Sequence, residues 1–534
     1  MNEYSDLFDH IDLWVDYLVK LIDLKPEDKG HAIKYQRQLE AVLSFRQATG
    51  SSPRHNFIMA DLYSDQIGQY LQQDIKDAQN SLRTLKIDPI QDCYTQTNSA
   101  FKEIKKAISA KSIFFLQGPP GTGKTTSITE IVLQALEKNP NIRILIASET
   151  HAAVDNALNK ITGLLPNDLH QQVLRHPVYK FGNESLPGTE TFERANQCWE
   201  QLEKFDPELS EELWLTWNQG STTDLPKWIK HALAEKHRII GVTCNQLYSL
   251  VNSDSEDWDL SIIDECSKAT FPELLMPLTR SRKVIFVGDH HQLPPTFCKD
   301  ESDTLEQFEE EKANLIKGGV IDQMFKNAPA ELSGFLDTQY RMTPSIGTIV
   351  SETFYGGRLK NGRENTGQKD PIVWLDYQTH RKFPEVEPRN GGKLENSVEV
   401  ELILSELETI ASQPSKNTSI AIITPYLAQK RLLIKAIGAK FSKQLEIEID
   451  TVDAFQGRQA NIVFFSFVRN SGSMRFFSDH RRLNVAISRA EDQLFFVGMS
   501  SYLAKSETPV IQKILNSKIL VKTRPQPFVY ELIR

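Results

Sequence analysis

Cysteine is scarce in this sequence, which has five cysteines in 534 residues, none of them paired as Cys-x-x-Cys. Zinc modules, iron–sulfur clusters and disulfide frameworks all need cysteines at characteristic spacings. The sequence therefore argues against all three as organising features of the chain.

Long apolar runs are also absent, since none approaches the roughly 20 residues that a membrane-spanning helix needs. The first residues, 1–6, lack the basic region and apolar core of a secretory signal. We therefore expect a soluble cytoplasmic protein with no membrane partner.

Positive charge is not in excess, because the net charge is −9 and the isoelectric point is about 5.8. This argues against a uniformly basic nucleic-acid coat but is compatible with a local basic groove. The acidic stretches 300–303 and 309–311 are interpreted as a solvated loop, with a DNA-mimicking regulatory segment as the alternative.

A glycine-rich stretch is the most informative feature that is present. It follows the apolar run Ile113–Leu116 and consists of Gly118, Pro119, Pro120, Gly121, Thr122, Gly123, Lys124, Thr125 and Thr126. A strand that enters such a turn before a helix directs backbone N–H groups at a polyphosphate. Lys124 should reach the β- and γ-phosphates of ATP, and Thr125 should offer its hydroxyl to Mg²⁺.

A pair of carboxylates follows a second apolar run, Leu260–Ile263. Asp264 can hold Mg²⁺ through water, and Glu265 can orient and deprotonate the attacking water. A strand running into an acidic surface loop is the alternative, but the upstream phosphate loop favours the catalytic interpretation.

Apolar strands alternate with helix-compatible segments through most of the chain, which predicts an α/β fold with parallel sheets covered by helices. A chain of this length suggests two to four domains. We predict a helical N-terminal accessory region over 1–95, with too few alternating strands for a full β-barrel. A first ATPase domain follows over 96–330, containing a helical insertion at about 160–236, and a second domain covers 331–534. Four tryptophans in the insertion are interpreted as a small core, with base stacking as the alternative.

Several further motifs carry a resemblance to superfamily 1 helicases, of the branch typified by the RNA-surveillance helicase of nonsense-mediated decay and its DNA-replication relatives. Beyond the phosphate loop they are Asp264–Ser267, Gly288–Pro295, Gln339–Met342, Val452–Gly457 and Arg482–Ala490. The resemblance implies two RecA-like P-loop NTPase domains with ATP bound between them.

The resemblance also implies roles for individual residues. Arg341 and Arg489 match arginines that contact the γ-phosphate, and Gln292 matches the glutamine that senses it. Tyr340 matches a residue that stacks on adenine. Gln96 and Gly457 are placed with the nucleotide-binding residues.

Nucleic-acid contacts are expected where strands end. Thr150 and His151 follow the strand expected at Ile142–Ala147, at the place where relatives touch the backbone of the strand they bind. Thr243 follows Arg238–Val242, and Thr424, Pro425 and Tyr426 follow Ile420–Ile423, because open α/β sheets bind ligands at strand ends. Each of these could equally form a turn or a helix cap. Relatives usually have Pro and Asn at the positions of Glu149 and His151, and Glu at that of Gln459.

The sequence therefore predicts an ATP-dependent helicase or translocase acting on single-stranded or tailed DNA or RNA, with 5′ to 3′ movement implied by the resemblance. Two alternatives stay open, an ATPase that clamps nucleic acid without unwinding it, and a catalytically silent nucleic-acid-binding scaffold. The N-terminal region and the insertion are candidate surfaces for a protein partner.

Overall fold

The computed structural model of the protein describes most of the chain. The described residues are 5–24, 26, 28–47, 53–65, 67–176, 200, 204, 227–250, 258–318, 320–364, 370–377, 394–412, 418–441, 445–455, 457–472, 479–506, 508–517 and 519–523. They form two units. The first comprises Met1–Gly118, Gly123–His290 and Pro294–Leu336, and the second comprises Asp337–Arg534 with the short segments Pro119–Thr122 and His291–Leu293.

The first unit is built on a seven-stranded sheet in the order β3-β4-β2-β5-β6-β1-β7, whose paired strands are all parallel. Its strands are β1 (Ile113–Gln117), β2 (Ile144–Ser148), β3 (Val173–Arg175), β4 (Ile239–Thr243), β5 (Leu260–Asp264), β6 (Val284–Gly288) and β7 (Ser333–Phe335). Six of them, all except β7, are buried along their whole length, and five of these six (β1, β2, β4, β5 and β6) are mostly apolar, as strands covered on both faces are.

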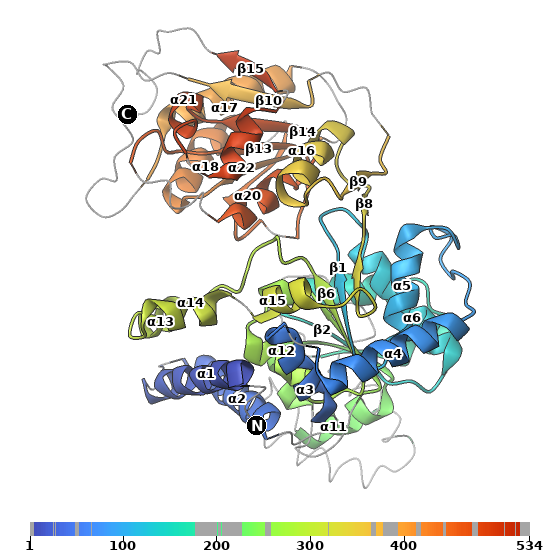
Figure 1. Ribbon diagram of the computed structural model, residues 1–534. Helices are drawn as coiled ribbons and strands as arrows, with labels where there is room; N and C mark the ends of the chain where they lie inside the picture. Colours follow the sequence, from blue (N-terminus) through green and yellow to red (C-terminus); the bar gives the residue numbers. More distant parts are fainter. Residues whose placement is uncertain are drawn as a thin grey trace. The chain divides into compact units, whose positions relative to one another are not determined.

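Helices cover both faces of this sheet (Figure 1). One face carries α5 (Ser99–Ser109), α6 (Lys124–Lys138) and α7 (His151–Thr162), and the other carries α12 (Phe271–Leu278) and α15 (Val320–Asn327). The remaining described helices of the unit beyond residue 84 are α8 (Asn167–His170), α11 (Lys227–Lys236), α13 (Lys299–Leu305), α14 (Glu310–Gly318) and the short 3₁₀ segments η2 (Cys244–Ser249) and η3 (Cys266–Lys268).

Four further described helices come before α5 in the chain: α1 (Ser5–Asp23), α2 (Lys29–Arg46), α3 (Pro53–Tyr63) and α4 (Gln69–Thr84). Their apolar faces belong to the same hydrophobic core as the sheet. Gln38 of α2 donates to Glu273 Oε1 of α12 at 3.3 Å. The N-terminal helices are therefore an integral layer of the first unit.

One interpretation of the acidic stretches is wrong. Asp300–Asp303 lies within helix α13, and Glu301 is buried at 6% exposure instead of lying in a solvated loop. Glu301 accepts a hydrogen bond from Lys34 Nζ at 3.0 Å, and its backbone oxygen accepts one from the Tyr17 hydroxyl at 3.1 Å. The buried ion pair explains why a carboxylate is tolerated there.

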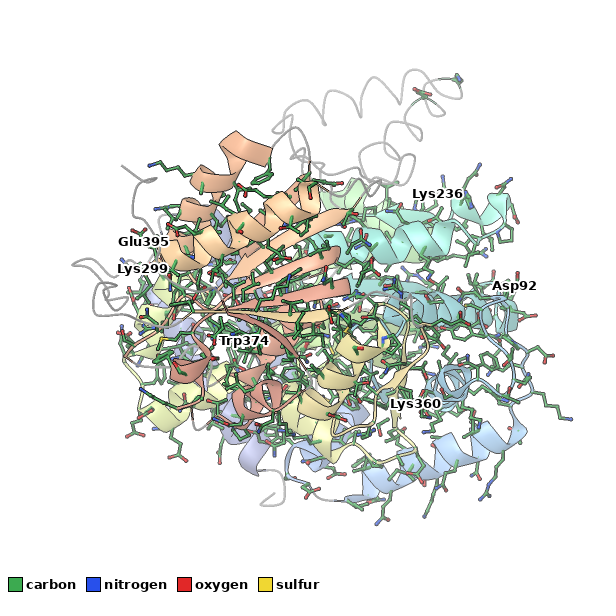
Figure 2. All side chains as sticks on the ribbon, turned by 90° about the horizontal axis from the view of Figure 1, so that it is seen from above. Asp92, Lys236, Lys299, Lys360, Trp374 and Glu395 are labelled. Atoms are coloured by element: carbon green, nitrogen blue, oxygen red, sulfur yellow. The ribbon has the colours of Figure 1, made fainter. Side chains whose placement is uncertain are left out.

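The second unit repeats the architecture with a six-stranded parallel sheet in the order β12-β11-β13-β14-β10-β15. Its strands are β10 (Ile372–Asp376), β11 (Ser419–Thr424), β12 (Glu446–Thr451), β13 (Ala460–Ser466), β14 (Ala490–Val497) and β15 (Leu520–Thr523), and a separate pair joins β8 (Thr338–Gln339) to β9 (Lys360–Asn361). Trp374 of β10, labelled in Figure 2, is buried and stacks on Phe467.

Helices also line this second sheet. On one side α17 (Ser397–Ala411) and α18 (Leu427–Phe441) share a core with β10, β11 and β13. The other described helices are α16 (Pro344–Phe354), α20 (His480–Ile487), α21 (Ser500–Leu503) and α22 (Pro509–Leu515). Two parallel sheets with flanking helices confirm the predicted α/β fold class with two RecA-like domains.

The interval 160–236, predicted as a helical insertion, is only partly described. It contains α8, the C-terminal part of α7 and α11, but also β3, which pairs with β4 and extends the sheet. Residues 177–199, 201–203 and 205–226 lie outside the described residues, and so does the side chain of Trp228. The interpretation of the tryptophans as a core therefore stays a prediction.

Candidate functional site

The glycine-rich loop connects β1 to α6, as the sequence predicts. Gly123 caps the helix with φ of +81°, a left-handed conformation that glycine adopts at little cost. A Cβ on Gly118 would lie 2.2 Å from Lys124 Cγ, so only glycine lets that side chain cross the loop. The hydroxyl of Thr122 closes the turn by donating to Pro119 O at 2.7 Å. Thr125 and Thr126 lie in the first turn of α6 and are partly exposed.

Lys124 connects the loop to the carboxylates at the end of β5. Its Nζ donates to Gly118 O at 3.0 Å and lies 3.8 Å from Glu265 Oε1. Lys124 and Glu265 are both partly accessible to solvent, with side-chain exposures of 15% and 21%. The structure thus brings Lys124 to Asp264 and Glu265, which lie about 140 positions further along the sequence.

Asp264 and Glu265 have different surroundings although they are adjacent. Asp264 is 4% exposed, and its Oδ1 accepts a hydrogen bond from Glu265 N at 2.9 Å. The pKa of Asp264 is raised to about 7, mainly by burial and then by the charge of Glu265, while the charge of Lys124 opposes both effects. Glu265 has φ of +52°, and backbone in such a strained region persists where the surrounding structure enforces it, often at functional sites.

The donor set at this edge fits Mg²⁺. Thr125 offers a hydroxyl and Asp264 a carboxylate, and Mg²⁺ prefers such hard oxygen ligands while keeping several waters and substrate phosphates. A cation there would also offset the burial that raises the pKa of Asp264. Among the described residues, no group of three or more His, Cys, Asp or Glu side chains could hold a metal alone.

Gln292, Arg341 and Arg489 all belong to the second unit as it is divided above. Arg489 is 3% exposed, and its Nη2 donates to Gln292 Oε1 at 3.1 Å. Arg341 Nη1 donates to the backbone oxygen of Ser488, which precedes Arg489, at 3.1 Å. The structure therefore places the two predicted arginines and the predicted glutamine in one cluster.

Three predicted nucleotide-binding residues lie in varied surroundings. Tyr340 is 57% exposed, as a ring available for stacking must be. Gly457 has φ of +85°. Gln96 is not brought to the loop, because its amide donates to Ile87 O and Asp88 Oδ1, both at 2.6 Å. Gln91, which sequence reasoning missed, donates instead to Thr126 O at 2.9 Å.

The predicted nucleic-acid residues of the first unit lie at strand ends. Thr150 caps α7, since its hydroxyl accepts from Ala153 N at 3.3 Å. His151 Nδ1 lies 2.9 Å from Arg175 Nη2, and burial, followed by the charge of Arg175, lowers the pKa of His151. Thr243 is 5% exposed and donates to Gln246. Arg175 also pairs with Asp155 and was missed because β3 lies in the interval predicted as an insertion.

The corresponding residues of the second unit follow β11. Thr424 is fully buried, and its Oγ1 has no hydrogen-bond partner among the described residues. Pro425 and Tyr426 are partly exposed. The Tyr426 hydroxyl accepts from Arg469 Nε at 2.8 Å, which adds a residue that the sequence did not single out.

Within the described part of the chain, no helix combines the length and apolar character needed to cross a membrane.

Two family models match, each described as an AAA domain, one over residues 96–212 and 193–300 and the other over residues 319–501. The chain is 29% identical over 433 residues to DNA polymerase alpha-associated DNA helicase A of Saccharomyces cerevisiae, covering 72% of this chain and 62% of the relative. It is also 29% identical over 437 residues to ATP-dependent helicase upf1 of Schizosaccharomyces pombe, covering 76% of this chain and 45% of the relative.

The chain thus spans about half to three fifths of the length of these two relatives. Among solved structures, the Arterivirus nonstructural protein 10 (helicase) aligns with a TM-score of 0.37 and 14% identity, covering 77% of this chain and 63% of that chain.

Proposed function

From the premise that this chain belongs to superfamily 1 of the helicases, we propose that it is an ATP-dependent helicase or translocase acting on single-stranded or tailed nucleic acid. One observation carries the proposal: Lys124, Asp264 and Glu265 meet where β1 and β5 of a parallel sheet end. The carboxyl edge of such a sheet is where α/β proteins bind nucleotides.

ATP would lie on the phosphate loop, with Lys124 and the backbone N–H groups at the start of α6 on its phosphates. Mg²⁺, held by Thr125 and Asp264, would neutralise charge on the phosphate oxygens. Glu265 would accept a proton from the attacking water, whose oxygen bonds to the γ-phosphorus as the bond to the bridging oxygen breaks. Its partial exposure suits this role better than the burial of Asp264 does.

The arginine cluster would report on the state of the nucleotide. We assign Arg489 and Arg341 to the charge of the γ-phosphoryl group, because a guanidinium stabilises charge spreading over phosphoryl oxygens. Gln292, already hydrogen-bonded to Arg489, would transmit the loss of that group. ATP and its hydrolysis products would then favour different conformations of the protein, and these conformations would differ in their affinity for the nucleic-acid strand.

Each unit would contact the nucleic acid with residues at the ends of its own strands. In the first unit these would be Thr150, His151 and Thr243, and in the second Thr424, Pro425 and Tyr426. Movement from 5′ to 3′, a cytoplasmic location, a protein partner on the N-terminal region or the insertion, and the three-part domain division stay predictions.

A pair of assays tests the proposal. ATP hydrolysis is measured with and without single-stranded DNA or RNA, and strand displacement is measured on duplexes with a 5′ or a 3′ tail. We expect stimulated hydrolysis and unwinding from one tail only, with both lost in Lys124→Ala.

Other outcomes separate the alternatives. Stimulated hydrolysis without displacement or translocation would favour an ATPase clamp. Absent hydrolysis with intact binding to oligonucleotides would favour a silent scaffold and defeat the proposal.

A further inference from the structure

A backbone distortion follows β13 in the second unit. Val468 has φ of +70°, and it is fully buried. Positive φ is a genuine outlier for a β-branched side chain, because its branched Cβ crowds the backbone. Such conformations persist where the surrounding structure enforces them, and they cluster at ligand-binding positions.

A buried carboxyl group enforces this one. Glu399 of α17 is fully buried, and both its oxygens lie 2.9 Å from Val468 N. Ser466 Oγ donates to Glu399 Oε2 at 2.6 Å, and Asn396 Nδ2 donates to Val468 O at 2.8 Å. The peptide groups on both sides of the Val468 Cα are therefore held by side chains of another element.

The next residue, Arg469, is placed beside Tyr426. Its Nε donates to the Tyr426 hydroxyl at 2.8 Å, and its guanidinium carbon lies 5.7 Å from the centre of that ring. Arg469 is partly exposed, and among the described residues it forms no ion pair with a carboxylate. The Tyr502 hydroxyl donates to the backbone oxygens of Ser471 and Gly472 at 3.0 and 3.1 Å, which holds the last described residues of this segment.

The surroundings indicate what this arginine binds. β11 and β13 are parallel neighbours, so Thr424 and Arg469 leave the sheet at the same edge. A guanidinium that has no carboxylate partner among the described residues and lies beside a partly exposed aromatic ring suits a phosphate flanked by a base.

We infer that Arg469 binds a backbone phosphate of the nucleic-acid strand next to Tyr426, and that Glu399 is a positioning residue that aims Arg469 by holding Val468 in its left-handed conformation. The inference rests on the proposed function and deepens it, because it adds a permanently charged contact to the threonine, histidine, proline and tyrosine residues already assigned to the strand.

The first experiment measures binding of a fluorescently labelled single-stranded oligonucleotide by anisotropy over a range of salt concentrations. Arg469→Ala should weaken binding by about tenfold and reduce the slope of log K against log salt by about 1, as loss of one phosphate contact does. The matched control is Arg431→Ala, since Arg431 is exposed on α18, and it should change affinity by less than about twofold. Equal affinities of the two variants would overturn the inference.

The second experiment tests the positioning role with a double-mutant cycle. Glu399→Gln should weaken oligonucleotide binding several-fold while the KM for ATP without oligonucleotide stays unchanged. Glycine adopts positive φ freely and does not need Glu399 to hold it there. In a Val468→Gly background, Glu399→Gln should therefore change the affinity for the oligonucleotide by less than about twofold. A full effect of Glu399→Gln in that background would refute the positioning role.

The two proposals fail in different ways. A wild-type protein that binds no oligonucleotide would defeat the proposed function itself. A wild-type protein that binds, with Arg469→Ala binding equally well, would defeat only the role of Arg469.

Discussion

Gly118→Ala is a direct test of how the phosphate loop positions its lysine. The new methyl group would lie 2.2 Å from Lys124 Cγ and 2.8 Å from Lys124 Cδ, closer than carbon atoms approach without displacement. The nearest other atom, Leu336 Cδ1, is 3.4 Å away, so the flexible lysine is the part that moves. We therefore expect a folded protein whose Lys124 no longer reaches its present place.

The size of the effect follows from losing the hydrogen bond that Lys124 would donate to the phosphates of ATP. A hydrogen bond that involves a charged group contributes about 1.5–3 kcal/mol. Losing it from the transition state for ATP hydrolysis lowers kcat/KM by roughly 10- to 150-fold. Steady-state ATPase kinetics measure this value, and thermal unfolding of the same sample checks that the fold is intact.

Gly438→Ala is the matched control. Gly438 lies in helix α18, and a Cβ there would meet no atom within 4 Å. Alanine in a helix is favoured over glycine by about 0.5–1 kcal/mol, so this variant should unfold at a higher temperature with unchanged ATPase kinetics. Wild-type kcat/KM in Gly118→Ala would refute the steric reasoning.

Three further predictions concern other residues. Glu265→Gln should bind ATP nearly as wild type does but hydrolyse it about 10²–10⁴-fold more slowly, because the general base is lost; equilibrium nucleotide binding and single-turnover hydrolysis measure the two effects, and unchanged hydrolysis would contradict the assignment. Lys34→Met should lower the free energy of unfolding in urea by about 1–3 kcal/mol at neutral pH, because Glu301 stays buried without its cation. The pKa of Glu301 is lowered in the folded state, mainly by Lys34 against the cost of burial, so this difference should shrink as the pH falls through that pKa; a constant difference would contradict it. Burial raises the pKa of Glu399 from 4.5 to about 8, so the folded state keeps a proton that the unfolded state releases. The free energy of unfolding should therefore fall as the pH rises from about 4.5 to about 8, by up to about 1.4 kcal/mol per pH unit. Glu399→Gln should flatten this pH profile, and parallel profiles of variant and wild type would refute the reasoning.

Buried strands were the elements that the sequence predicted best. Continuous apolar runs such as Ile113–Leu116 and Val284–Val287 coincide with β1 and β6 because both faces of those strands are covered. The edge strands were missed. In β12 charged and apolar residues alternate, and in β15 Leu520 and Val521 are 41% and 55% exposed, so neither forms a buried apolar run.

By itself, the sequence determined the phosphate loop and the carboxylate pair, because each is encoded in a few adjacent residues. It also determined that two parallel sheets follow one another along the chain, because most of their strands are short apolar runs that can be recognised locally. Only the tertiary structure decided that Glu399 holds Val468, that Arg469 lies beside Tyr426, and that Gln91 rather than Gln96 contacts the helix after the loop. The physical reason is that these contacts join side chains from different elements, and their distances depend on how parallel strands and helices pack.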